Sequence, residues 1–354
     1  MLNRAFLKDY WRKARWLLLR VAIIWVVDLF IHMQQAAEQQ KSMALAADER
    51  SASMDWLSLY LSHLSADWWS PHLLRTFQIP WLMMTVVMLS ILLFEDDRRT
   101  WTSDLMFSLP VPRQSLFFTK WIVGVVVITT TTLLFFCVTS TYHYLFSQWT
   151  YTSYWVLPQF CIATALAYLL AFTLALLLQT QIGKPVVAGV VAFLSPFGLR
   201  TGITLIVNFI WFNIGLPYDH PLIAKLTRLK YLRFSNLYAP NMMVATDPGP
   251  VALSYQNWLV NVFVLIVLVW LAYRLGNLAY TKNSAERNGL LIMFDQLIPL
   301  IRWGGALGFG SVIAYWLARP ALGHNIMRLD LLFVVGTVLS YLILSKALRN
   351  TARA

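Results

Sequence analysis

The chain has 354 residues, of which 58% are hydrophobic and only 12% are charged. Soluble proteins carry about 25% charged residues, and a soluble fold could not hide this much apolar surface from water. The composition therefore excludes a disordered chain, a secreted disulfide scaffold and a cytosolic enzyme, and it indicates a protein embedded in a bilayer. The formal charge of +12 does not indicate nucleic-acid binding, because the Lys and Arg residues form no continuous stripe.

Near the N-terminus, residues 1–15 are basic and precede the first apolar run. A signal peptide would have the same beginning, but Arg20 and Asp28 interrupt this run and no suitable cleavage site follows closely. We therefore expect an uncleaved first span over 16–31.

Intervals without charge locate the other spans, because a charge at the bilayer centre costs about 2.5 to 3.5 kcal/mol on insertion scales. The stretch from Trp121 to Gly183 contains no charged residue and is long enough for two spans, with an aromatic turn over 142–155 between them. We predict an all-α polytopic membrane protein with about eight transmembrane helices. The remaining spans are expected at 76–94, 184–216, 258–273, 303–318 and 331–345.

Lys and Arg residues favour the cytosolic side by about two to one when the N-terminus is placed inside. This bias predicts that both termini lie in the cytosol of a bacterial cell, with the chain in the cytoplasmic membrane. The long outer loops then cover 32–75 and 217–256. Because the second contains Pro221, Pro240, Pro248 and Pro250, we expect a packed lid of short turns there.

The fifth apolar segment, 184–216, is broken by Pro196 and Arg200. We predict a span that ends near position 199, followed by a re-entrant return, which would make this break part of a transport path. A single kinked helix packed against its neighbours remains the alternative. Thr129 and Thr130 either line the same path or bond back to their own helix.

Catalytic and metal-binding patterns are not found in the sequence. The six histidines fall in predicted outer loops without metal-ligand spacing, and the two cysteines lie within apolar runs. The only Gly-Lys pair is Gly183-Lys184, but Leu178 stands where a phosphate-binding loop needs Gly, and Pro185 stands where it needs Ser or Thr. We therefore expect no enzyme activity, no catalytic residue, no metal and no cofactor in this chain.

The cytosolic loop over 95–120 carries the most specific pattern. Its centre predicts a short amphipathic helix that ends at a proline, with the positions Trp101, Leu105, Leu109 and Pro110. The acidic residues Glu95–Asp97 suit the N-terminus of such a helix. An apolar ridge of this size is more than an isolated loop could bury, so the loop is expected to bind a partner.

This loop resembles that of the ABC-2-type permeases, the membrane subunits of ATP-binding-cassette transporters, in bacterial forms whose ATPase is a separate chain. Their pattern is an acidic-basic pair, Gly-Thr, an apolar helix, Leu-Pro-x-x-Arg, and a Lys that opens the next span. The corresponding positions here are Asp97, Arg98, Thr102, Leu109, Pro110, Arg113 and Lys120. Trp101 departs from the pattern, because Gly is usual there.

Two further segments are similar to parts of the same family. Residues 282–289 are similar to the Arg/Lys-x-x-Glu-x-x-Gly segment before the last spans of its longer members, and Tyr10 and Trp11 lie in a stretch that looks like the family's interface helix. The resemblance implies an interface helix over 1–15, a six-span core over 16–278, and a connector with two added spans over 279–354. It also implies a dimer of permeases, identical or homologous, and two ATPase subunits that hold ATP and Mg²⁺ and dock on the 95–120 loop.

We therefore expect a permease whose ATPase partner docks around Asp97, Arg98, Trp101, Thr102, Leu105, Leu109, Pro110 and Arg113. The count of 16 Trp, 15 Tyr and 21 Phe favours a hydrophobic or amphipathic cargo, such as a peptide, a drug or a lipid-like compound. We therefore expect the chain to export such a compound. The alternative is a membrane sensor or assembly protein whose outer loops bind a ligand and whose cytosolic loop binds a partner that is not an ATPase.

Overall fold

The computed structural model describes residues 7–17, 19, 20, 23, 27, 78–99, 112–145, 154–193, 195, 241–243, 252–254, 257–283, 292–294, 297–318 and 326–352. The chain divides into two compact units, and each is described separately. Unit 1 is drawn from Met1–Leu177 and Ser235–Lys282, and unit 2 from Leu178–Phe234 and Asn283–Ala354.

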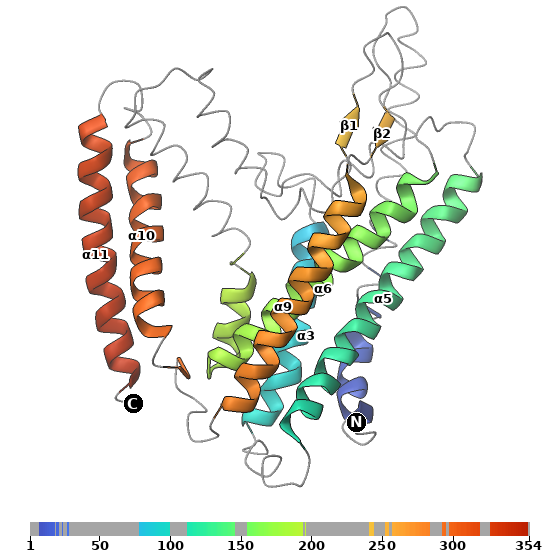
Figure 1. The fold of residues 1–354 in the computed structure, drawn as a ribbon, viewed down its shortest axis with the longest axis horizontal. Coiled ribbons are helices and arrows are strands. Elements are labelled where there is room, and N and C mark those ends of the chain that lie inside the picture. Colours follow the sequence, from blue (N-terminus) through green and yellow to red (C-terminus); the bar gives the residue numbers. More distant parts are fainter. Residues whose placement is uncertain are drawn as a thin grey trace, which may run out of the picture. The chain divides into compact units, whose positions relative to one another are not determined.

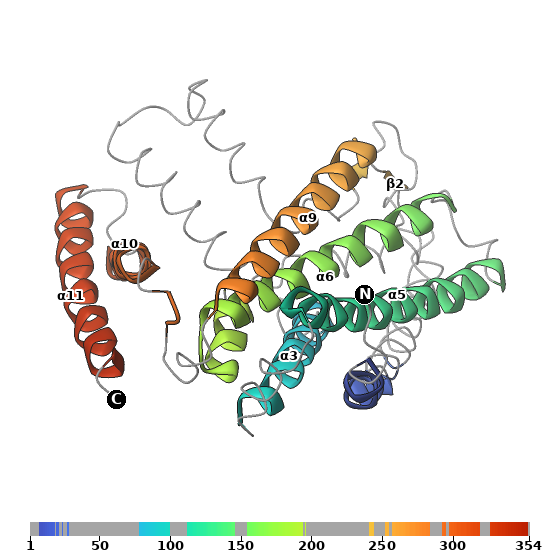
Figure 2. The same cartoon turned by 60° about the horizontal axis from the view of Figure 1, so that its bottom comes forward.

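Unit 1 is built from long helices, which Figure 1 labels. They are α3 (Gln78–Arg99), α5 (Arg113–Leu145), most of α6 (Val156–Gln181) and α9 (Trp258–Lys282). The N-terminal helix, residues 7–17, also belongs to this unit. Figure 2 shows α5, α6 and α9 running alongside one another.

Three helices in the described part of the chain are long and apolar enough to cross a bilayer: Arg113–Thr141, Val156–Gln181 and Trp258–Lys282. A shorter apolar helix covers Met83–Glu95 within α3. These helices establish a multi-pass membrane protein, whereas the total of about eight spans stays a prediction. The charge-free interval divides as expected, since α5 and α6 lie on either side of the aromatic turn.

Side chains of α6 hold α5 on one side and α9 on the other. Gly124 of α5 lies directly against the ring of Phe172, so that an added Cβ would overlap it. Beside this contact the indole nitrogen of Trp121 donates a hydrogen bond of 3.1 Å to Thr173 Oγ1. At the other end of α6, the indole of Trp258 donates one of 3.1 Å to the carbonyl of Gln159. Close backbone approach and a few interhelical hydrogen bonds are how helices associate within a bilayer.

The described part of the second outer loop contains an antiparallel pair of strands, β1 (Asn241–Met243) and β2 (Ala252–Ser254). Met242 is opposite Leu253 in the register. The sequence predicted short turns here and no strand. Runs of three residues carry too little alternation to be recognised without knowledge of the pairing.

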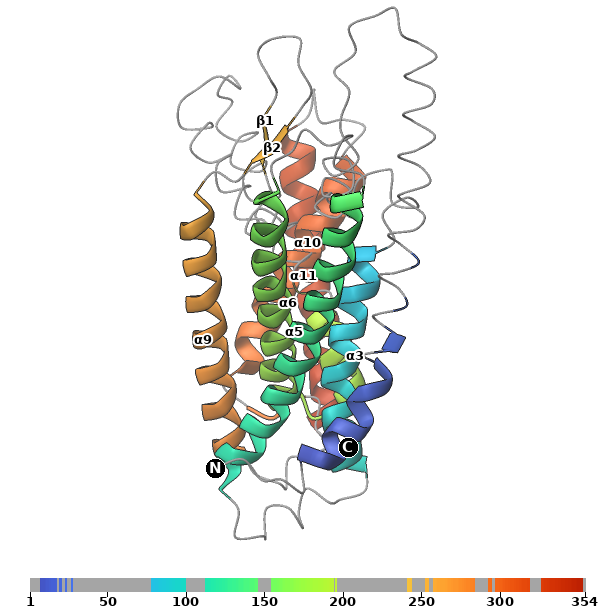
Figure 3. The same cartoon turned by 90° about the vertical axis from the view of Figure 1, so that its right-hand side faces the viewer.

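Unit 2 contains α10 (Leu297–Ala318) and α11 (Ile326–Ala352), which pack side by side in Figures 1 and 3. Gly310 of α10 faces Gly336 and the backbone of Thr337, so a Cβ at this position would overlap α11. Gly304 and Gly308 form a G-x-x-x-G pair, yet within the described residues nothing lies within 4 Å of a Cβ built on either. The close contact between α10 and α11 is therefore made at Gly310 and not at this pair.

The short turn after α6 is also part of unit 2. The side chain of Gln179 donates a hydrogen bond of 2.9 Å to the carbonyl of Pro185, and helix 185–193 follows directly. The backbone N–H of Met293 donates one of 2.8 Å to the carbonyl of Gln181. This bond satisfies one of the carbonyls left free at the end of α6 and ties residues 292–294 to the turn.

Candidate functional site

The helix before the candidate loop is longer than its apolar span. It continues through Glu95–Asp97 to Arg99, so these acidic residues lie at the C-terminal end of α3. The sequence had suggested that they begin a helix in the loop, and this prediction was wrong. No Pro or Gly interrupts the chain here, and Arg98 and Arg99 suit the negative end of a helix dipole. Asp97 and Arg98 are thus carried by the last helical turn before the loop.

On the other side of the loop, Arg113 is the first residue of α5 and is half-buried. Its Nη1 atom donates a hydrogen bond of 3.4 Å to the carbonyl oxygen of Thr281. Thr281 is the penultimate residue of α9, where helix carbonyls have no partner within the helix and the dipole favours a cation. Arg113 therefore connects the C-terminal edge of the loop to α9.

About two turns further along α5, the side chain of Lys120 is almost fully buried, with 1% of its surface exposed. Its ammonium nitrogen lies 3.7 Å from the centroid of the Phe94 ring. The rings of Tyr10 and Tyr280 are 5.4 Å and 5.8 Å away. All three rings lie within the distance at which aromatic faces attract a cation. We call Tyr10, Phe94, Lys120 and Tyr280 the lysine cage.

The rings of the cage also pack on one another. Phe94 and Tyr280 meet edge to face, with centroids 6.0 Å apart and an interplanar angle of 89°. Phe117 lies beneath, 5.6 Å from Tyr280. Gly276 faces the Phe117 ring so closely that a Cβ there would be 2.7 Å from its Cζ atom. The cage is therefore continuous with the α5–α9 interface.

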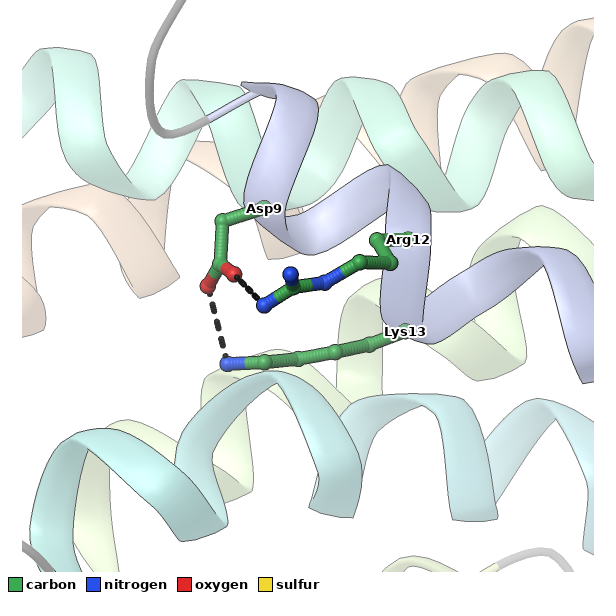
Figure 4. Close-up of polar contacts among 3 residues, drawn as sticks. All are labelled: Asp9, Arg12 and Lys13. Atoms are coloured by element: carbon green, nitrogen blue, oxygen red, sulfur yellow. Dashed lines mark hydrogen bonds and ion pairs between the residues drawn. The ribbon is translucent and has the colours of Figure 1, made fainter.

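The N-terminal helix contributes Tyr10 to the cage, and it buries Tyr10 and Ala14 almost completely. Figure 3 shows this helix beside α3, and the Arg20 guanidinium lies 3.7 Å from Met88 Sδ. On its exposed side, Asp9 accepts from both Arg12 and Lys13 at 3.0 Å, as Figure 4 shows. These exposed pairs neutralise part of the basic helix and stabilise it by about 0.3 to 0.5 kcal/mol each.

The centre of the predicted docking loop lies outside the described residues; these positions are Trp101, Thr102, Leu105, Leu109 and Pro110. Pro196 and Arg200 of the predicted transport path also lie outside them.

Thr129 is described, and its hydroxyl donates to the carbonyl of Val125 at 2.7 Å. Thr131 and Thr132 bond back to their own helix in the same way. This favours the structural interpretation of the threonine run. Thr130, its neighbour, is half-buried in α5.

The described residues include no group of three or more His, Cys, Asp or Glu side chains placed to hold a metal ion. Gly183-Lys184 forms the tight turn after α6, and the Lys184 carbonyl accepts the N–H of Ala188 at 3.0 Å. Its role in this turn is structural, with Pro185 at the first position of the next helix, where proline is favoured.

The lysine cage was not predicted from the sequence. Lys120 was noted only as part of a family pattern, and Phe94 only as the end of a predicted span. Tyr280 lies beyond the predicted end of its span at position 273. A lysine at the start of a span normally extends its ammonium to the headgroups. Only the placement of three separate segments around it reveals that this one is enclosed.

Residues 67–229 match the model of a family described as ABC-2 family transporter protein. The match covers somewhat less than half of the chain and includes α3, the 95–120 loop, α5 and α6. It confirms that this region resembles the ABC-2-type permeases, as the loop pattern indicated. No curated protein and no solved structure matches the chain.

Proposed function

We propose that this chain is the permease subunit of an ABC transporter and that a separate ATPase subunit docks on the 95–120 loop. The observation that carries the proposal is the position of this loop. It lies within the matched region, and both of its flanks are anchored to other helices. Before the loop, Phe94 of α3 packs in the cage; after it, Arg113 of α5 bonds to α9 and Lys120 enters the cage. A partner that moves such a loop also moves the helices to which it is tied.

The mechanism follows from this anchoring. Closure of the ATPase subunits around ATP displaces the loop, and α3 and α5 carry the displacement into the membrane. ATP can shift the equilibrium between the inward-open and outward-open arrangements only if the ATPase subunits bind the two arrangements with different free energies. A shift of the ratio of the two arrangements from 1:99 to 99:1 requires a difference in binding free energy of about 5.5 kcal/mol.

The working assembly in this proposal contains two permease chains, identical or homologous, and two ATPase subunits in the bacterial cytoplasmic membrane, with the permease termini in the cytosol. The cargo is a hydrophobic or amphipathic compound, and the direction is export. The composition supports this cargo, because the spans offer many aromatic and few ionisable side chains.

Co-purification of the chain with an ATPase from its own cells, followed by ATPase measurement in lipid, tests the proposal. Leu109→Asp places a charge on the predicted apolar ridge and should abolish both co-purification and cargo-stimulated hydrolysis. Ser103→Asp adds the same charge on the opposite face of the predicted helix and should leave both near wild type. Equal effects of the two variants would argue against docking through this ridge. A working unit without any ATPase would favour the sensor alternative.

A further inference from the structure

The lysine cage collects one residue from each of four segments. Tyr10 comes from the N-terminal helix, Phe94 from α3, Lys120 from α5 and Tyr280 from α9. The segments are far apart in sequence, and three of the four residues are less than 3% exposed. The ammonium of Lys120 is thus a shared contact of the segments that surround the two ends of the 95–120 loop.

Burying this cation has a free-energy cost that an apolar residue would avoid. An ammonium withdrawn from water must be compensated, and aromatic faces compensate it only within about 6 Å and from above the ring. Leu, Met or Phe would fill the same volume without this requirement. A buried cation therefore specifies the relative positions of its partners more strictly than apolar packing does.

The charged residues of the N-terminal helix near the cage are consistent with a fixed position of this helix. Lys13 of the N-terminal helix has its Nζ 5.7 Å from the centroid of the Tyr10 ring, which is the ring that also faces Lys120. Two cations on one ring would repel, but Asp9 lies 3.0 Å from Lys13 and offsets its charge. The N-terminal helix therefore carries its own neutralising carboxylate where it meets the cage.

From this arrangement the geometry points to Lys120 as a positioning residue. It fixes the N-terminal helix to α3 and α9, so that these segments move with the ends of the 95–120 loop as one body. The inference rests on the proposed function only in that the ATPase subunit drives the movement. The attachment of the N-terminal helix to α3 and α9 does not need nucleotide, and it is tested without nucleotide.

The test uses pairs of spin labels in the full chain, in complex with its ATPase and in lipid. Cys137 and Cys161 are first replaced by alanine, because both are free thiols. One pair joins the N-terminal helix to α9 through Lys8→Cys and Lys282→Cys, both exposed positions. The control pair joins α5 to α9 through Gln114→Cys, also exposed, and Lys282→Cys.

Lys120→Met keeps an unbranched side chain of similar length and removes the charge. Without nucleotide, it should broaden the distance distribution of the 8–282 pair at least twofold and leave that of the 114–282 pair unchanged. Phe94→Leu should broaden the first distribution as well. Phe118→Leu, which removes a half-buried ring of α5 outside the cage, should not. Lys120→Arg, which retains a cation, should restore most of the wild-type width.

With ATP trapped, the 8–282 distance should stay the same in the wild type, because the two helices move together. It should shift in Lys120→Met, although the ATPase still co-purifies. An 8–282 distribution in Lys120→Met as narrow as in the wild type would overturn the inference. So would equal broadening of both pairs, because that indicates general loosening of the fold. Failure of the wild type to retain any ATPase would instead overturn the proposed function, and the nucleotide-free comparison would still decide the role of Lys120.

Discussion

Arg113 and Thr281 are 168 positions apart in sequence, yet the guanidinium of the first donates a hydrogen bond of 3.4 Å to the backbone carbonyl of the second. The bond joins the first turn of α5 to the last turn of α9 (Figure 1). It places a fixed positive charge at the negative end of the α9 dipole, where a cation stabilises a helix by about 0.3 to 1 kcal/mol.

Replacement of this charge should therefore weaken the α5–α9 contact. Arg113→Glu should lower the free energy of unfolding by about 1 to 2 kcal/mol, because it removes the bond and places a like charge beside the free carbonyls. Arg113→Lys should lose less than half as much. Thermal unfolding in detergent measures both. Gln114→Glu, which introduces the same charge at the exposed neighbouring position, is the control, and an equal loss there would contradict this role for Arg113.

The contact between α5 and α6 at Gly124 leaves no room for a side chain. Gly124→Ala should destabilise unit 1 by about 1 to 3 kcal/mol, the range for overpacking a close interface. Phe172→Leu removes the atoms that the new methyl group would meet. The double variant should therefore be more stable than the sum of the two single effects predicts, and strictly additive losses would show that the two residues do not meet.

The hydrogen bond between Trp121 and Thr173 gives a second measurement of this interface. Thr173→Val removes the acceptor and preserves the shape, so it should cost about 0.5 to 1.5 kcal/mol. Thr131→Val is the comparison, because the Thr131 hydroxyl donates to the carbonyls of Val127 and Ile128 in its own helix, α5 (Figure 1). The same loss at both positions would indicate that the interhelical bond adds nothing.

Two glycines of α10 should respond differently to the same substitution. Gly310→Val would place its side chain into the backbone of α11 and should cost more than about 2 kcal/mol, or separate the two helices. Gly308→Val enters open space and should change stability by less than about 0.5 kcal/mol. Limited proteolysis of the purified protein, which detects separation of α10 from α11, distinguishes the two variants. A sensitive Gly308→Val variant would show that its face is covered in the assembled transporter.

The course of the membrane helices could be predicted from the sequence because the signals are local. Charge-free stretches fix where a helix can lie in the bilayer, and the aromatic turn divides α5 from α6. The end of α3 was harder, because the acidic residues Glu95–Asp97 favour a helix start whereas the adjacent Arg98 and Arg99 favour a helix end.

Only part of the candidate site could be predicted, because some of its residues are close in sequence and others meet only in the fold. The resemblance at Asp97, Arg98 and Arg113 depends on residues within one loop, and the family match includes that loop. The enclosure of Lys120 depends instead on Tyr10 and Tyr280, which are remote in sequence. No periodicity or spacing marks such a cluster, because its members share a place in the fold and not a pattern along the chain.

The most direct test of the central claim is photocrosslinking in intact cells from a single reactive residue at position 105. We predict one major product, which contains an ABC-type ATPase and diminishes when Leu109→Asp is added. The matched control is the same probe at Tyr144, which is 84% exposed at the opposite end of α5 and should not capture the ATPase. Capture of the ATPase from position 144 and not from 105, or a product at 105 that contains no nucleotide-hydrolysing protein, would contradict the account.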